Sequence, residues 1–450
     1  MRPALPETVP VKATHLHPAS SVPSQVPRRK HGHTDALSGR GIGALYPPVL
    51  SRSADGTDLS NSRTCRRSAA LTIRPGSPTF RGRRSHRRCL LVFLTPFLWP
   101  ALAAAATSEM VSALAKELAH LATGPPSNSM LREPRWTTPN RIALELPSMR
   151  LREFSADGDD TASLICAPLA LHDATLTDFA PDHSLVAALR MAGLRNVFVT
   201  DWRSASPEMR FFSIDSYLAD LNVVVDELGG CVNLVGLCQG GWMALVYAAR
   251  YPSKIHGLVL AGAPVDINAG ESELSRVAHS VPTSVFKHLV ELGDGRVRGS
   301  HLLQLWKHPS LEPEAIHGLL QVPDDIATPR SSRLIALFRE WYARPVDLPG
   351  TYYLQVVEWL FKDNQLATGR FAALGRPIDL SIVHVPIFLL AARDDEIVAP
   401  EQLLATRHLV GSKGPQIRKQ VVACTHLGLF MGATTLVHTW PKIARWLAAS

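Results

Sequence analysis

The stretch VNLVGLCQGGWMALVYAARYP, residues 232–252, places a cysteine between a short apolar run and a helical pattern. The run VNLV predicts a buried strand, and GWMALVYAARYP predicts a helix. Gly236 and Gly240 flank Cys238 in the pattern G-x-C-x-G. Glycines are required there because the central residue of such a turn is strained and the helix must pass close to the strand. The stretch therefore predicts a nucleophile elbow with Cys238 as the nucleophile.

An acid and a histidine follow the cysteine in the order that this turn leads us to expect. Asp395 follows the apolar run VPIFLLAA, and His426 follows KQVVACT. We expect His426 to take the proton from Cys238 while Asp395 holds the tautomer of the imidazole. Asp394 is the alternative acid, and we expect it to face solvent. The partial positive charge at the N-terminus of the helix favours the thiolate of Cys238.

Two backbone segments are candidates for the oxyanion hole. One N–H group should come from Gln239, which follows the nucleophile. The other should come from the loop after the run LICAPLA, where Leu171 and His172 lie. We expect His172 to organise this loop near the site and not to serve as a base.

Several short apolar runs with helical segments between them predict the fold class. Continuous runs of this kind are typical of parallel strands covered on both faces. They predict an α/β fold with a mostly parallel, doubly wound sheet. Between two of the runs, residues 268–382 predict a helical insertion that forms a cap. Its aromatic residues should mainly pack the core of the cap, although such a cap would also form an apolar access channel. The expected strand runs are ASLICAPLA, NVFVTDW, VNLVGL, GLVLAGAP, VPIFLLAA and KQVVACTH, and the expected helices are 181–192, 213–228, 240–251 and 434–448.

Composition excludes some classes of protein. The hydrophobic fraction of 46% and the charged fraction of 19% are typical of a globular chain. The net charge of +8 arises from basic residues in the first hundred positions, without a nucleic-acid-binding module beside them. The six cysteines show no metal-binding spacing, so we expect reduced thiols and neither metal nor redox cofactor. Cys166, Cys231 and Cys424 are predicted to be small buried side chains.

Residues 1–109 are predicted to be a disordered basic extension rich in Pro, Ser and Arg. Within it, residues 90–106 are apolar and follow a basic run, as in a secretory signal, but far from Met1. Three interpretations stay open: upstream sequence preceding a natural start near Met110, an internal signal anchor, or a true extension. A membrane-spanning helix is not favoured, because the segment is short and contains prolines. The catalytic domain is predicted to occupy residues 110–450.

Residues 135–450 resemble the polyhydroxyalkanoate enzymes of the α/β-hydrolase superfamily. GLCQGGWMALVYAARYP is similar to the lipase-like box of polyhydroxyalkanoate synthases, which use cysteine in place of serine. RDDEIVAP and THLGLFMG match the acid and histidine motifs of the family. The resemblance implies an α/β-hydrolase fold in which Cys238, Asp395 and His426 form the triad.

Other motifs are more similar to the intracellular polyhydroxybutyrate depolymerases. They are APLALHDATL, GAPVDINAGESELSRVA and the stretch from YYLQVVEWLFKDN to GRPID. The Pro-Pro and Asn-Lys stretch of the synthases is absent, and Ala399 and Pro400 stand where the synthases have a tryptophan after the acid motif. These departures favour the depolymerase branch, whereas the box itself favours the synthases.

The resemblance therefore implies three hypotheses. The first is an intracellular depolymerase that hydrolyses poly(3-hydroxybutyrate) through a thioester acyl-enzyme. The second is a synthase that polymerises 3-hydroxyacyl-CoA, and the third is a non-catalytic granule-binding protein. The implied partner is a polyester granule or 3-hydroxyacyl-CoA, not nucleic acid, and the implied location is the cytoplasm at such granules. The sequence does not determine the oligomeric state.

Overall fold

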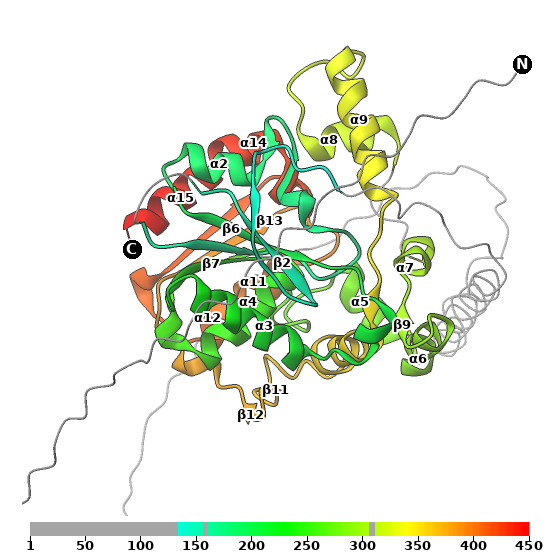
Figure 1. Ribbon diagram of the computed structural model, residues 1–450, viewed down its shortest axis with the longest axis vertical. Coiled ribbons are helices and arrows are strands. Elements are labelled where there is room, and N and C mark those ends of the chain that lie inside the picture. The colour runs from blue at the N-terminus through cyan, green and yellow to red at the C-terminus, as the bar shows by residue number, and fades with distance from the viewer. Residues whose placement is uncertain (1–133, 156–159, 306–310, 450) are drawn as a thin grey trace, which may run out of the picture. The chain divides into compact units, whose positions relative to one another are not determined.

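The computed structural model describes residues 134–155, 160–305 and 311–449 (Figure 1). The extension predicted at residues 1–109, with its apolar segment 90–106, lies outside these ranges. Within them, no helix is both long and apolar enough to cross a bilayer.

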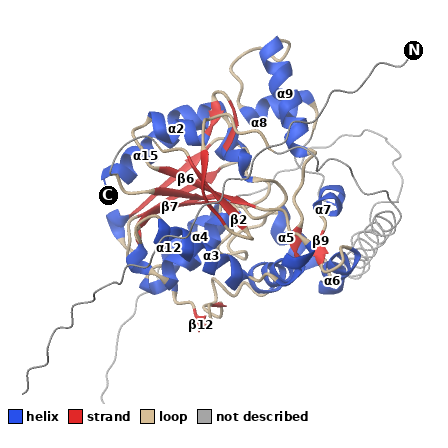
Figure 2. Cartoon of the chain, viewed as in Figure 1, coloured by secondary structure: helices blue, strands red, loops and turns tan. Residues whose placement is uncertain are grey.

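An eight-stranded sheet forms the centre of the described part (Figure 2). Its strand order is β1-β2-β6-β3-β7-β8-β13-β14. β2 pairs antiparallel with β1 and with β6, and the other neighbours are parallel. The mostly parallel sheet predicted from the apolar runs is confirmed. The strands are β1 (Arg141–Glu145), β2 (Met149–Glu153), β3 (Ser163–Cys166), β6 (Val197–Trp202), β7 (Val232–Leu237), β8 (Ile255–Ala261), β13 (Ile387–Ala392) and β14 (Ile417–Val422).

Helices cover both faces of the sheet, which makes it doubly wound (Figure 1). One face carries α2 (Leu185–Met191), α14 (Ala433–His438) and α15 (Trp440–Ala449), and the other carries α3 (Ile214–Glu227), α4 (Gln239–Arg250) and α12 (Thr406–Leu409). Because both faces are covered, every residue of β6, β7 and β13 is buried. Together with the nucleophile turn before α4, this architecture is the α/β-hydrolase fold. Short elements beside the sheet are β4 (Asp178–Ala180), β5 (His183–Ser184), α11 (Pro400–Leu404) and α13 (Gly428–Met431).

Three elements differ from the sequence expectation. β14 is only partly buried, because it is the edge strand and has one neighbour. The helix predicted at 181–192 begins only with α2, where Ser184 accepts the N–H of Ala187 as N-cap. The helix predicted at 434–448 is divided into α14 and α15, because Pro441 lacks the N–H that a continuous helix needs.

The segment between β8 and β13 is mostly helical and packs beside the sheet (Figure 1). α10 continues directly into a π-helix, η5, which is a rare form often found at functional sites. The helices are α5 (Glu273–Ser280), α6 (Thr283–Leu292), α7 (Gly299–Leu305), α8 (Pro313–Leu320), α9 (Pro329–Tyr342), α10 (Gly350–Gln355) and η5 (Val356–Lys362). Two short hairpins accompany them, β9 (Arg296–Val297) with β10 (Leu348–Pro349) and β11 (Ala372–Ala373) with β12 (Arg376–Pro377).

Helix α4 approaches the strand ends more closely than side chains would permit. A Cβ atom on Gly240 would lie 2.1 Å from the carbonyl oxygen of Cys166. A Cβ atom on Gly241 would lie 2.3 Å from the Cβ atom of Ala263. Both distances are far below van der Waals contact, so only glycine fits at these positions. The glycines thus hold the start of α4 against the loops that follow β3 and β8.

We expect Gly240→Ala to lower the free energy of unfolding by about 1–3 kcal/mol or more, because the new methyl group overpacks a backbone contact. Gly318→Ala is the matched control, since Gly318 lies in α8 with no atom within 4 Å of an added Cβ. That substitution should be neutral or stabilising by up to about 1 kcal/mol. Thermal unfolding of both variants measures the difference, and equal midpoints would contradict the close approach.

Candidate active site

Cys238 is held in a strained backbone conformation at the start of α4. Its φ is 48° and its ψ is −118°, a region that costs free energy for any residue with a side chain. Its N–H donates to the carbonyl of Ala261 at 2.9 Å, and its carbonyl accepts the N–H of Gly241 at 2.9 Å. These bonds fix the turn, and the half-buried thiol faces the pocket described below.

Asp395 and His426 form a buried pair beside the thiol. Nδ1 of His426 lies 2.8 Å from Oδ2 of Asp395, and the two side chains are 3% and 1% exposed respectively. Oδ1 of Asp395 also accepts the backbone N–H groups of Ile397 and Val398 at 3.0 and 2.8 Å. These bonds orient the carboxylate, which in turn orients the imidazole. Nε2 of His426 is left for the hydrogen bond with Cys238.

The electrostatics of the pair favour a protonated His426. Burial by itself lowers the pKa of His426, but the negative charges of Asp395 and of Cys238 outweigh burial and raise it well above its usual range. An imidazolium beside the sulfur stabilises the thiolate, which is the nucleophilic form of cysteine. The structure therefore brings together all three residues predicted for the triad.

Glu396 is a site residue that the sequence did not single out. Its carboxylate accepts the N–H of His426 at 3.3 Å, and its carbonyl accepts the N–H of Glu273 on α5 at 3.2 Å. It thus connects the histidine loop to the insertion. Its only signal in the sequence is its place after two aspartates. The side chain of Asp394, the alternative acid, is 62% exposed, and its Oδ1 lies 3.9 Å from Nε of Arg393.

Gln239 and the loop after β3 border the position of a reacting carbonyl. Gln239 is the first residue of α4, and the N–H groups of a first turn have no acceptor within their helix. In the loop, the N–H of Ala167 donates to Oγ1 of Thr200 at 3.0 Å, and Pro168 has none. Leu169 therefore carries the first amide after β3 that could face an oxyanion, and it lines the pocket.

Leu171 and His172, the predicted loop residues, line the same pocket farther along the loop. The carbonyl of Leu171 accepts the N–H of Val346 at 2.9 Å, which ties the loop to the segment after α9. The ring of His172 packs on Trp341 and Tyr342, with centroids 4.3 and 4.8 Å apart. These contacts hold the loop against the C-terminal end of α9.

His172 is electrically neutral in this position. Burial lowers the pKa of His172 to about 3, and the backbone of Arg344 opposes that shift only in part. Among the residues that the structure describes, neither ring nitrogen of His172 meets a partner at hydrogen-bonding geometry. The His172 ring therefore packs against its aromatic neighbours as an uncharged side chain and takes up no proton near neutral pH. This behaviour fits the predicted role of organising the loop.

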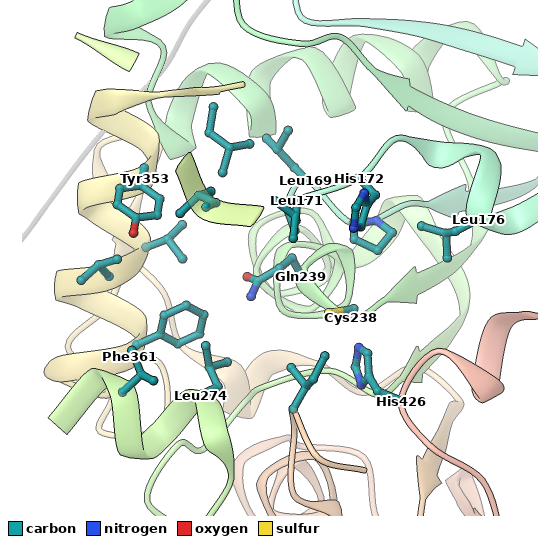
Figure 3. A pocket seen from close by; sticks show the side chains of 18 of the residues that line it. Leu169, Leu171, His172, Leu176, Cys238, Gln239, Leu274, Tyr353, Phe361 and His426 are labelled. Atoms are coloured by element: carbon teal, nitrogen blue, oxygen red, sulfur yellow. The ribbon is translucent and has the colours of Figure 1, made fainter. Parts of the chain in front are cut away.

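An apolar pocket of about 240 Å³ opens beside the thiol (Figure 3). Its walls come from the loop after β3, from the start of α4 and from the insertion. The insertion contributes aromatic residues to the wall, and those predicted to pack its core, such as Trp341 and Tyr352, are buried in the core and also border the pocket. They are Phe286, Trp341, Tyr342, Tyr352, Tyr353 and Phe361, beside aliphatic residues such as Leu274, Val277, Leu302, Val356 and Val357.

The other cysteines of the described ranges lie outside this pocket. Burial raises the pKa of Cys166 and of Cys424 to about 12 each, so both remain thiols near neutral pH. Cys231 is exposed, so its predicted burial is wrong. It directly precedes β7, at the solvent end of the strand. Across the described ranges, no group of three or more His, Cys, Asp or Glu residues is placed to hold a metal ion.

Comparison with known proteins gives one family match and several named relatives. Residues 148–434 match the model of a family described as "Protein of unknown function (DUF3141)". The chain is 25% identical over 280 residues to the poly(3-hydroxyalkanoate) polymerase subunit PhaC of Allochromatium vinosum, covering 60% of this chain and 76% of the relative. The subunit of the same name from Synechocystis sp. is 28% identical over 287 residues, covering 61% and 74%.

Solved structures with similar folds include a monoacylglycerol lipase from Paleococcus ferrophilus and an epoxide hydrolase from Bacillus megaterium. The lipase has 18% identity and a TM-score of 0.44, and the match covers 67% of this chain and 98% of the lipase. The epoxide hydrolase has 15% identity and a TM-score of 0.44, and the match covers 68% and 99%.

We expect Asp395→Asn to lower the pKa of His426, because the carboxylate that raises it is removed while burial remains. Titration of the His426 ring followed by NMR measures this change. Asp394→Asn is the matched control and should leave the titration where it is, since that carboxylate is exposed. Equal shifts in both variants would contradict the assignment of Asp395 as the partner of the imidazole.

We expect His426→Ala to slow alkylation of Cys238 at neutral pH by about tenfold or more, because the imidazolium that stabilises the thiolate is lost. Iodoacetamide labelling followed by peptide mass spectrometry measures the rate. Cys231, which is exposed, serves as an internal standard in the same sample. An unchanged ratio of the two labelling rates would show that His426 does not activate the thiol.

Proposed function

Because the chain belongs to a protein family of unknown function (DUF3141), we propose its activity from its own site. In this proposal Cys238 accepts a 3-hydroxyacyl group from a thioester such as 3-hydroxyacyl-CoA. It then transfers the group to the hydroxyl end of a polyester. The observation that carries this proposal is a thiol, hydrogen-bonded to a buried His–Asp pair, at the wall of an apolar pocket. The relatives named as polymerase subunits support it.

A thiol nucleophile favours a thioester donor over an ester donor. The tetrahedral intermediate expels its better leaving group, and a thiol with a pKa of about 8.5 leaves far more readily than a hydroxyl compound, for which water at about 15.7 is the reference. Attack on an oxyester therefore tends to return the Cys238 thiolate, unless His426 protonates the alkoxide. When Cys238 attacks a thioester, both possible leaving groups of the tetrahedral intermediate are thiolates with similar leaving ability. The donor thiolate can therefore leave, and Cys238 becomes acylated.

Acylation follows from the geometry of the triad. The Cys238 thiolate attacks the carbonyl carbon, and the negative charge on oxygen is held by the N–H groups of Gln239 and Leu169. The C–S bond of the donor then breaks, a new thioester forms on Cys238, and the departing thiolate takes the proton of the His426 imidazolium. His426 is then neutral and can act as a base, while Asp395 keeps its tautomer.

Deacylation uses the neutral His426. The hydroxyl of a chain end loses its proton to His426 as its oxygen attacks the thioester, and Cys238 leaves as thiolate. One ester bond forms, one thioester bond breaks, and the imidazolium is restored. If water attacks in place of the hydroxyl, the same steps give hydrolysis.

Polyester hydrolysis is the second candidate function. The motifs similar to intracellular depolymerases favour it, as do Ala399 and Pro400 in place of the synthase tryptophan. The sequence motifs favour hydrolysis, whereas the names of the relatives and the leaving-group chemistry support acyl transfer, which we therefore propose first. In both cases we propose that the protein acts at polyester granules in the cytoplasm and binds no nucleic acid.

We expect wild-type full-length protein to release CoA from 3-hydroxybutyryl-CoA and to form polymer, and Cys238→Ala to reduce the rate by at least about 10³-fold, as for other nucleophile deletions. Cys231→Ala is the matched control and should retain full activity. Free CoA is followed with a thiol reagent, and polymer by precipitation.

Amorphous polyhydroxybutyrate granules are assayed in parallel with the same three proteins. Soluble 3-hydroxybutyrate from granules without CoA release from the thioester would replace the acyltransferase with the depolymerase. No detectable activity on either substrate, or activity that remains in Cys238→Ala, would overturn the proposed chemistry.

A further inference from the structure

Two consecutive tyrosines on α10 have different roles. Tyr352 is buried, and its hydroxyl donates to the carbonyl of Leu169 at 3.3 Å, which fixes the loop after β3. Tyr353 points elsewhere, because consecutive residues of a helix lie about 100° apart. Its ring lines the pocket and packs on Phe286, with centroids 6.2 Å apart.

The Tyr353 hydroxyl is a polar group in an apolar wall. No hydrogen bond to it occurs within the described ranges, and burial raises the pKa of Tyr353 well above its usual range, so the group remains an O–H donor. In Figure 3 its oxygen lies among the pocket side chains, with Gln239 between Tyr353 and Cys238 in that view. A donor without a protein acceptor costs free energy when a ligand covers it, unless the ligand supplies the acceptor.

The wall that carries Tyr353 is fixed in place. Lys362, at the end of η5, donates through Nζ to the carbonyls of Ala278 and Val281 at 2.7 Å each. These bonds connect η5 to the C-terminal end of α5, which forms a neighbouring part of the wall. Because η5 continues α10, these bonds support the helix that carries Tyr353, and a specificity contact requires such support.

The size of the cavity allows an acyl chain to extend from Cys238 toward Tyr353. Its volume of about 240 Å³ is far above the roughly 10–15 Å³ of probe-occupied space that a single water molecule requires. A chain of several heavy atoms beyond the reacting carbonyl therefore fits. Apolar walls accept its methylene and methyl groups, and they leave any oxygen on the chain in need of a donor.

We propose that the Tyr353 hydroxyl donates a hydrogen bond to a second oxygen of the acyl chain, beyond the reacting carbonyl. The site would then prefer acyl groups with a distal ester or hydroxyl, such as a chain of linked hydroxyacyl units, over plain hydrocarbon tails. This inference rests on the proposed acylation of Cys238, and it names the class of acyl group for that step. The 3-oxygen next to the reacting carbonyl is not part of it.

Tyr353→Phe tests the inference because it removes only the hydroxyl. The two donors are the CoA thioester of a 3-hydroxybutyrate dimer and a 3-hydroxyalkanoyl-CoA with a hydrocarbon tail of equal length. We expect wild type to prefer the dimer in kcat/KM, and Tyr353→Phe to reduce this preference by about three- to tenfold, the effect of one neutral hydrogen bond. An unchanged preference overturns the inference.

Tyr247→Phe is the matched control. The Tyr247 hydroxyl bonds Oδ1 of Asn222 at 3.1 Å on α3, and neither residue lines the pocket. This variant should keep the wild-type preference. Thermal unfolding of both tyrosine variants shows that each is folded, and a loss of preference in both variants would also overturn the inference.

Binding to the Cys238→Ala protein separates this inference from the proposed function. Calorimetry with the same two thioesters, with and without Tyr353→Phe, measures the preference without any reaction. If wild type forms no acyl-enzyme but the dimer still binds more tightly through Tyr353, acyl transfer fails and the inference stands. If acylation occurs but Tyr353→Phe leaves both preferences unchanged, the inference fails and acyl transfer stands.

Discussion

The turn at Cys238 is the constraint on which the rest of the site depends. A non-glycine residue at a φ of 48° is unfavourable, and it persists because β7, α4 and the end of β8 hold it from three sides. The glycines after it allow α4 to approach the Ala263 side chain in the loop after β8 and the backbone at the end of β3. This close approach places the first amide of α4 beside the loop that carries Leu169, so the same strained turn sets the position of the half-buried thiol and of that amide.

The triad lies between a buried pair of charged side chains and an apolar pocket. The Asp395–His426 pair is almost fully buried, and its charges are satisfied by each other, by Cys238 and by backbone N–H groups. The pocket beyond the thiol is formed mainly by hydrocarbon and aromatic groups from the insertion. A low-dielectric wall strengthens the ion pair. In the proposed reaction the same wall would accept the acyl chain, so activation of the thiol and acyl binding would depend on the same exclusion of water.

The insertion also reaches the catalytic loops directly. His172 packs on Trp341 and Tyr342 at the end of α9, and the Tyr352 hydroxyl donates to Leu169. On the other side, the Glu396 backbone accepts the N–H of Glu273 on α5, and its side chain accepts that of His426. The helices that form the pocket thus position both the loop after β3 and the loop of His426. In the proposed reaction, a change in the cap would affect these two loops as well as the pocket.

The sequence alone determined the parallel sheet and the elbow, and it predicted that Cys238, Asp395 and His426 come together, because each depends on a local pattern: an apolar run, a glycine spacing, or a polar residue directly after a strand. It did not determine where α2 begins, the exposure of β14, or the contacts of Glu396, Leu169 and Tyr353. Those depend on which segments meet after folding. Glu396 matters because α5 and the His426 loop converge on it, and Tyr353 because α10 turns its hydroxyl toward a cavity formed by residues far apart in the chain. Periodicity and spacing report on neighbours along the chain, whereas contacts across the insertion are decided by tertiary packing.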